Sequence, residues 1–135
     1  CIMAGSIKDL SKYRYERSSE ELENAKAMLE CGKFKLSLNR SYYSIFHGMR
    51  AVNVLDEFDS SKHSGVIAHF NQYHVKTGDF SKEASKIIRT SSEMREHADY
   101  EDFFVASRQE AEEQVQKAQK FHEIITSYLQ EKGIF

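Results

Sequence analysis

Hydrophobic positions recur at helical spacing along most of the chain, most clearly between residues 33 and 55. At about 100° per residue, one broad arc collects the apolar residues Phe34, Leu38, Tyr42, Ile45, Phe46, Met49 and Val52. Such an arc is typical of a helix that faces a bundle core. Nearly opposite lie Arg40, Tyr43, His47 and Arg50, and between the two runs a stripe of small residues, Ser37, Ser41, Ser44 and Gly48. The pattern predicts a central helix with one cationic, aromatic face.

The same periodicity predicts four further helices. We expect them at about 8–31, 62–75, from 81 to about 98, and 108–132. Gly32 and Gly133 are placed to end helices, and Ser107 with Glu110 fits a capping box. Asp59, Ser60 or Ser61 is expected to cap the helix at 62–75. Residues 1–7 are expected to be a loose end and 99–106 an irregular turn or frayed helix end.

Composition supports an all-α fold. The 135 residues contain no proline and six glycines, fewer breaks than turn-rich β folds need. With short connections, the pattern predicts an up-and-down bundle of four long helices plus one short helix, in a single domain over residues 1–135. The formal net charge of −2 excludes nucleic-acid binding through overall charge alone. A local patch is available, because no acidic residue occurs between Glu30 and Asp56.

Cysteine usage and hydropathy exclude several classes of protein. Cys1 and Cys31 form neither a disulfide framework nor a metal-ligand spacing. No apolar run approaches the roughly 18 residues of a membrane span, and no signal-peptide pattern appears. We therefore expect a cytoplasmic protein with no membrane partner.

The histidines give no metal motif. Carboxylate-bridged bundles use Glu-x-x-His pairs, and no histidine here has a glutamate three positions before it. His63, His69 and His74 follow one another at spacings of six and five, which do not place ligands on one face of an α-helix as an i, i+4 pair would. We expect no metal site and no cofactor.

Two groups of residues could carry chemistry. Arg40 and His47 are two turns apart on the central helix, with Tyr43 between. An arginine can grip a phosphate and a histidine can move the proton of a ribose 2′-hydroxyl, which suffices for metal-free RNA cleavage. In the structural alternative, Arg40 pairs with a carboxylate of a neighbouring helix and His47 caps the core edge.

The second group runs from Arg95 to Tyr100. Arg95 and Asp99 are one turn apart and can form a local ion pair. Tyr100 stands at the end of its helix, where its hydroxyl can reach solvent or a partner. The segment is acidic on balance, which by itself does not favour a phosphate site.

Three blocks in this order resemble the HEPN family (higher eukaryotes and prokaryotes nucleotide-binding), above all its small stand-alone bacterial and archaeal members. They are the segments at 39–47 (NRSYYSIFH), 62–67 (KHSGVI) and Arg95 with 98–100 (ADY). The resemblance implies a helical bundle, usually a homodimer, that binds RNA or nucleotides. Many members are toxins that act as metal-independent ribonucleases, with a minimal nucleotidyltransferase as antitoxin.

The family motif is an arginine followed, after four to six residues, by a histidine late in the bundle. Arg95 matches by place, but Tyr100 stands where the histidine would be; Arg40 and His47 match by spacing, on an earlier helix. Catalytic candidates are therefore Arg40, His47, Arg95 and Tyr100. Candidates for RNA or nucleotide contact are Arg40, Tyr43, Arg50, Lys62, His63, Arg95 and Asp99.

Tyrosine, with a pKa near 10, is a poor general base at neutral pH, so a site built on Arg95 and Tyr100 implies binding without cleavage. Tyr100 would then be a conceivable acceptor for the partner nucleotidyltransferase. A non-catalytic dimer that binds such a partner and a plain helical adaptor remain alternatives. The small-residue stripe fits either a dimer interface or close packing inside one bundle.

Overall fold

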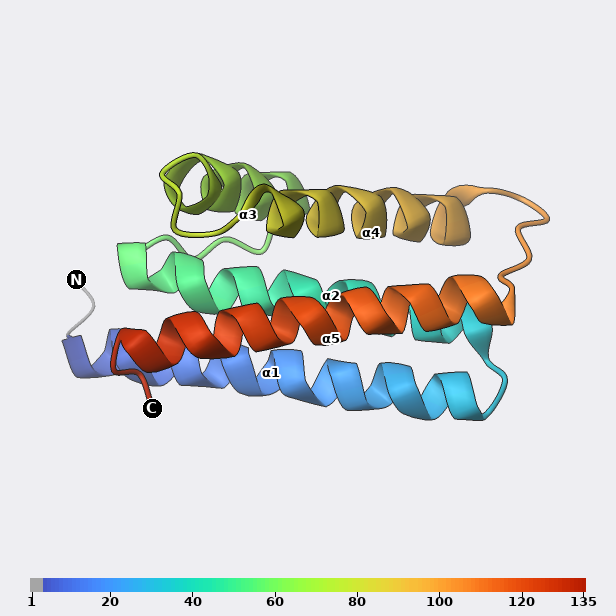
Figure 1. The fold of residues 1–135 in the computed structure, drawn as a ribbon, viewed down its shortest axis with the longest axis horizontal. Helices are drawn as coiled ribbons and strands as arrows, with labels where there is room; N and C mark the ends of the chain where they lie inside the picture. The colour runs from blue at the N-terminus through green and yellow to red at the C-terminus, as the bar shows by residue number, and fades with distance from the viewer. Residues whose placement is uncertain (1–3) are drawn as a thin grey trace.

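The computed structural model describes residues 4–135. Its five α-helices form one all-α bundle, which confirms the predicted fold class. The helices are α1 (Ala4–Glu30), α2 (Phe34–Asn53), α3 (His63–Phe70), α4 (Lys82–Tyr100) and α5 (Arg108–Glu131). A 3-10 turn, η1 (Val54–Asp56), follows α2, and a π-helical turn, η2 (Asn71–Val75), follows α3. The four long helices alternate in direction, with α3 inserted between α2 and α4 (Figure 1).

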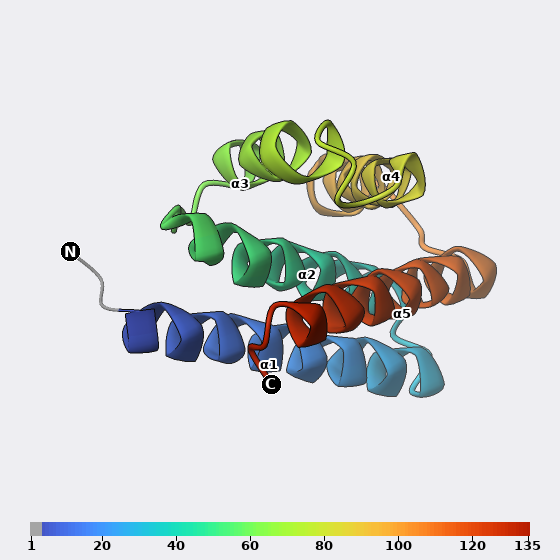
Figure 2. The same cartoon turned by 60° about the vertical axis from the view of Figure 1, so that its left-hand side comes forward.

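α2 occupies the centre of the bundle, as its apolar arc predicts. It packs against α1, α3, α4 and α5, and Figure 2 shows it between α1 below and the α3–α4 layer above. Its arc supplies fully buried core side chains, among them Tyr42, Ile45 and Met49. One face of this helix is therefore enclosed, while Arg40, Tyr43, His47 and Arg50 are only partly buried.

The small-residue stripe of α2 packs inside the bundle. Ser37 and Ser44 donate hydrogen bonds to backbone carbonyls of α1, at 2.8 and 2.9 Å. A Cβ on Gly48 would lie 3.3 Å from the Phe121 ring of α5. Of the two uses considered for this stripe, close packing within one bundle is the one observed.

The helix ends confirm some predicted signals. Ser107 accepts a hydrogen bond from the Glu110 N–H and the Glu110 carboxylate accepts one from the Ser107 N–H, completing the capping box. Gly32 and Gly133 have φ of 75° and 74° just past α1 and α5, a left-handed conformation that glycine adopts without strain.

The predicted start of the first helix and the predicted cap of the third are wrong. α1 already includes residues 4–7, which were expected to be loose; residues 1–3 lie outside the described part of the chain. α3 begins after Lys62, which makes no side-chain cap. Asp59 instead binds Arg14 and Arg50, because two guanidinium groups compete successfully for its carboxylate.

α4 continues through Tyr100, so the irregular connection begins at residue 101 rather than 99. Within residues 4–135 no helix combines the length and apolarity that crossing a membrane requires. Residues 71–75 form a π-turn where the spacing predicts the end of an α-helix, and this changes which side chains meet there.

Candidate functional site

Tyr43 of α2 lies beneath two arginine side chains from different helices. The Arg40 Cζ atom is 5.0 Å from the centre of the Tyr43 ring, and the Arg95 Cζ atom of α4 is 5.7 Å from it. Both distances are within the range of cation–π attraction. The two arginines, which belong to separate candidate sites in the sequence, share one surface in the folded protein.

Arg40 is also held by α1. Its Nη1 donates to the Glu21 carboxylate at 2.5 Å, and the Glu21 side chain is only 3% exposed. Asn24 donates a further hydrogen bond to Glu21 at 2.9 Å. This is the ion pair with a neighbouring helix that the structural alternative describes, so most of the Arg40 charge is already compensated.

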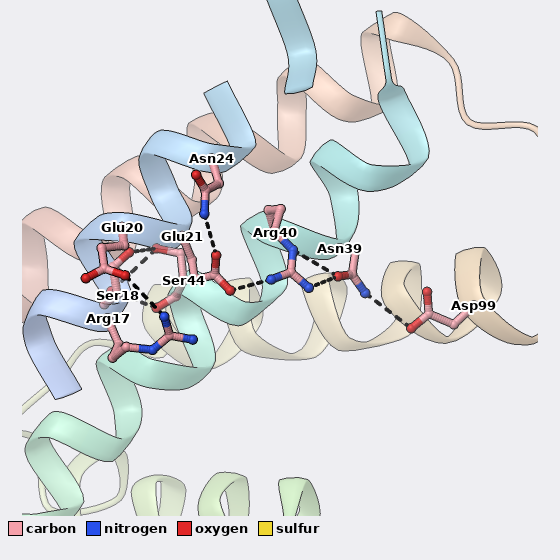
Figure 3. A network of polar contacts seen from close by, with 9 residues as sticks. All are labelled: Arg17, Ser18, Glu20, Glu21, Asn24, Asn39, Arg40, Ser44 and Asp99. Atoms are coloured by element: carbon pink, nitrogen blue, oxygen red, sulfur yellow. Dashed lines mark hydrogen bonds and ion pairs between the residues drawn. The ribbon is translucent and has the colours of Figure 1, made fainter. Parts of the chain in front are cut away.

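A polar chain runs from this ion pair to α4 (Figure 3). Arg40 donates to the side-chain oxygen of the adjacent Asn39. The Asn39 amide donates to the Asp99 carboxylate at 3.4 Å, and Asp99 lies 3.3 Å from the Arg95 Nε. Glu21, Arg40, Asn39, Asp99 and Arg95 thus form one row across three helices.

Arg95 is the less neutralised of the two arginines. Its Nε is near Asp99 but has no hydrogen bond with good geometry among the described residues. The guanidinium also lies 5.1 Å from the Tyr42 ring centre and 5.8 Å from that of Tyr100. Burial opposes its charge, but the three tyrosines and Asp99 outweigh burial and raise the pKa of Arg95. A fixed, desolvated cation of this kind is suited to a phosphate.

His63, at the start of α3, joins the same surface. Its ring stacks on Phe46 with centroids 4.4 Å apart, and its Nδ1 is 2.7 Å from the Tyr42 hydroxyl. Burial, and then the charge of Arg95, lower the pKa of His63. Burial raises the pKa of Tyr42 to about 12, so the partner hydroxyl is a neutral phenol. In the tautomer whose Nδ1–H donates to Tyr42, the Nε2 lone pair can accept a proton.

His47 lies on the other flank of Tyr43, with ring centroids 6.3 Å apart. Burial, and then the charges of Arg17, Arg50, Arg14 and Arg40 in that order, together lower the pKa of His47 from 6.5 to about 4. Its Nδ1 is buried without a hydrogen-bond partner in the described structure. His47 is therefore a neutral ring at the edge of an arginine cluster.

The remaining candidates surround these residues. Arg50 binds Asp59 at 2.9 Å and lies over the Phe46 ring. Lys62 is exposed immediately before His63, and the Tyr100 residue is 72% exposed. The structure thus brings together five of the seven predicted contact residues, Arg40, Tyr43, His63, Arg95 and Asp99, with the catalytic candidate Tyr100. His47 and Arg50 lie to one side, with Arg14 and Arg17.

Three participants were missed at the level of the sequence: Glu21, Asn39 and Tyr42. Tyr42 falls on the apolar arc and was assigned to the core, where its ring indeed lies. Periodicity places a ring on a face but does not show that its hydroxyl reaches a histidine 21 residues away. Asn39 belongs to the family-like block at 39–47 but is not among the residues predicted to contact a ligand, and Glu21 gives no signal apart from its polarity.

Comparison with known proteins now identifies the family. A family model described as "HEPN domain" matches residues 11–129. The chain belongs to the HEPN domain family. The three sequence blocks that suggest this membership lie in the middle of α2, at the start of α3 and at the end of α4. They carry Tyr43, His63, Arg95 and Tyr100, and the surface that these residues form is called the Tyr43 surface below.

Several HEPN relatives resemble the chain over most of their length. A UPF0332 protein of Thermotoga maritima is 31% identical over 89% of this chain and 91% of its own. A Methanocaldococcus jannaschii protein named "Putative toxin MJ0605" is 32% identical over 86% of each chain. A second, "Putative toxin MJ0142", is 29% identical over 93% of this chain and 90% of its own.

A separate group of possible metal ligands lies at the far end of α2. Asp56, His69 and His74 each offer one ligand atom, and these atoms all lie within 4.8 Å of one another. They share no residue with the Tyr43 surface.

The Tyr43 surface itself offers a cation from Arg95, a neutral imidazole from His63 and aromatic rings. Its residues form no metal ligand set among the described residues.

Proposed function

We propose that this HEPN protein binds single-stranded RNA on the surface formed by Tyr43, Arg95, His63 and Tyr100, as the toxin component of a toxin–antitoxin pair. The observation that carries the proposal is the position of the Arg95 guanidinium. It lies over the rings of Tyr43 and Tyr100 and over the ring of Tyr42, whose hydroxyl meets the His63 Nδ1 atom. Unpaired bases stack on tyrosine rings while arginine holds the backbone phosphate. The relatives named as toxins support the biological role.

The same residues suffice for metal-independent cleavage. Arg95 would hold the phosphate, and the His63 Nε2 would take the proton of the ribose 2′-hydroxyl. The 2′-oxygen then attacks phosphorus, the bond to the 5′-oxygen breaks, and that oxygen is protonated by imidazolium or water. The products are a 2′,3′-cyclic phosphate and a 5′-hydroxyl end. Arg40 and His47 take a supporting place, since Glu21 compensates Arg40 and four arginines surround His47.

The test is an RNA-cleavage assay in EDTA with a fluorescent single-stranded RNA. Wild-type protein is expected to cut it and to leave the all-deoxy analogue, which lacks the 2′-nucleophile, intact. His63→Gln and Arg95→Ala should each lower the rate about 100-fold or more. His97→Gln, which removes an exposed α4 histidine bonded to Glu101, should leave it unchanged. Cleavage that survives both site substitutions would exclude this site.

A second candidate function is binding without cleavage, as the partner of a minimal nucleotidyltransferase. The observation that favours it is the exposed Tyr100 residue at the end of α4, with its ring beside Arg95. An absence of cleavage for every RNA, together with RNA binding that Arg95→Ala abolishes, would favour this function. Transfer of a nucleotide to wild type but not to Tyr100→Phe would identify the acceptor.

We also propose that the chain acts as one domain, in the cytoplasm where its RNA target would be, and as a homodimer. Support for a dimer comes from large apolar side chains exposed at one end of the bundle. Leu36, Phe103 and Val105 are 50%, 100% and 84% exposed. Figure 1 places the start of α2 and the α4–α5 connection, which carry them, at the same end.

A further inference from the structure

We propose that Asp56, His69 and His74 form a binding site for a divalent first-row transition metal, best matched by Zn²⁺. The Nε2 atoms of His69 and His74 lie 2.9 and 2.6 Å from the same Asp56 Oδ2 atom. Two imidazole nitrogens and one carboxylate oxygen are a common protein ligand set for zinc, and they leave a fourth position for water. The proposal is independent of the RNA site, because the two share no residue.

The π-turn at Asn71–Val75 makes this arrangement possible. Residues five apart in an α-helix point about 140° away from each other, which is why the sequence spacing argued against a metal site. In a π-turn, hydrogen bonds run from residue i to i+5, as seen from the Lys76 N–H to the Asn71 carbonyl at 2.9 Å. The wider turn brings His69 and His74 onto one side, toward Asp56.

Both histidine rings are fixed in position before any ion binds. The His74 side chain is only 4% exposed, and its Nδ1 lies 3.4 Å from the Asp79 carboxylate. A carboxylate behind the second ring nitrogen is the usual outer partner of a metal-bound histidine, because it fixes the tautomer and the orientation. His69 stacks on Phe58 with ring centroids 4.2 Å apart. The two Nε2 atoms therefore converge with little loss of side-chain freedom.

The site is accessible from one side. Asp56 and His69 line an open surface groove together with Phe58, Gly65 and Tyr73, which provides an entry path for an ion. Ligand atoms around one tetrahedral zinc lie about 3.3 Å apart. The Nε2 atoms of His69 and His74 are 2.9 and 2.6 Å from the Asp56 oxygen, so each needs to move only a few tenths of an ångström away from it to admit the ion. Because Asp56 follows α2 and the histidines span α3 and η2, a bound ion would fasten the end of α2 to the upper layer.

The experiment uses untagged protein stripped with a chelator and then dialysed into chelator-free buffer. Zn²⁺ is titrated in competition with a chromophoric chelator, and Co²⁺ is added separately to read its visible absorption. The variants are Asp56→Asn and His69→Gln, with His97→Gln as the matched control for loss of one histidine. Circular dichroism verifies that each variant is folded; His69 and Asp56 were chosen over the buried His74 for that reason.

Wild type and His97→Gln are expected to bind one equivalent of Zn²⁺, to show intense Co²⁺ absorption bands typical of four-coordinate sites, and to gain thermal stability with Zn²⁺. His69→Gln and Asp56→Asn should each bind at least about 100-fold more weakly and lose the stability gain. Binding no tighter than micromolar in wild type, or equal affinity in His69→Gln and His97→Gln, would overturn the site and leave these residues as a hydrogen-bonded cluster only.

Discussion

At the scale of single residues, Arg40 and Arg95 differ in what compensates their charge. Arg40 faces the buried Glu21 carboxylate, whereas Arg95 faces Asp99 without a well-aligned hydrogen bond. Both lie over Tyr43. We infer that Arg40 mainly holds α1 to α2 and shapes the surface, and that Arg95 provides the cation for a ligand.

The first prediction concerns the Arg40–Glu21 pair. Arg40→Ala should lower the free energy of unfolding by about 2–4 kcal/mol, because it leaves a buried carboxylate without its cation. Combining it with Glu21→Gln should restore most of the loss, since no uncompensated charge remains. Urea unfolding of the two single variants and the double variant measures the coupling. Losses in the two single variants that add up to the loss in the double variant would show that the ion pair contributes nothing.

The second prediction concerns His47 and pH. Its pKa is lowered from 6.5 to about 4, so between these values the unfolded chain binds a proton that the folded protein does not. The stabilisation is therefore complete above pH 6.5 and is lost as pH falls toward 4. The ring is partly exposed, and after allowance for solvent screening the effect is about 1–2 kcal/mol.

The measurement is the free energy of unfolding at pH 7 and pH 4.5 for wild type and His47→Gln. Other titrating groups, including His63 and His122, are common to both proteins and cancel in the comparison. The wild type should lose about 1–2 kcal/mol more than the variant on acidification. An identical loss in both proteins would mean that His47 titrates normally.

At the scale of elements, α2 depends on close approach to its neighbours. Gly48→Val should destabilise the protein by about 1–3 kcal/mol, because the added side chain meets Phe121 and Ile125 of α5. Gly65→Ala on α3 is the control, since a Cβ there makes only ordinary contacts. Thermal unfolding compares the two. Full stability of Gly48→Val would contradict the tight α2–α5 contact.

The helices could largely be predicted from sequence, and the reason is local. Apolar spacing, Gly32, Gly133 and the capping box at Ser107 act within a few residues of the structure they specify. The turn at 71–75 could not be predicted in this way, because α and π hydrogen bonding differ by one residue and tertiary contacts decide between them. The expectation that the histidines form no metal site assumes α-helical spacing. It therefore does not hold for His69 and His74, because a π-helical turn lies between them.

At the scale of the whole molecule, the site could be predicted only in parts. The residues at 39–47 and 95–100 were each identified, but as competing sites. Their union depends on α4 packing against α2 so that two arginines reach one tyrosine. Contacts such as Tyr42 with His63 join segments far apart in the chain, and helical periodicity contains no information on them.

The homodimer is tested at the same scale. If the exposed apolar end carries the interface, wild type should run as a dimer in light scattering after gel filtration. Replacing Phe103 and Val105 together by Asp should give a monomer, because burying two carboxylates is costly. Gln116→Asp, on an exposed position of α5, should leave the dimer intact. A monomeric wild type, or a variant that still dimerises, would contradict this interface.

The most direct test of the Tyr43 surface is the affinity for a fluorescent single-stranded RNA at several salt concentrations, in EDTA. Arg95→Ala should weaken binding about 10–100-fold and reduce the slope of log affinity against log salt by about 0.7, the loss of one phosphate contact. Arg89→Ala, an exposed arginine of α4 in a groove with Ile67 and Asn71, should change neither. Equal affinities and slopes for the two variants would contradict the proposal that RNA binds beside Tyr43.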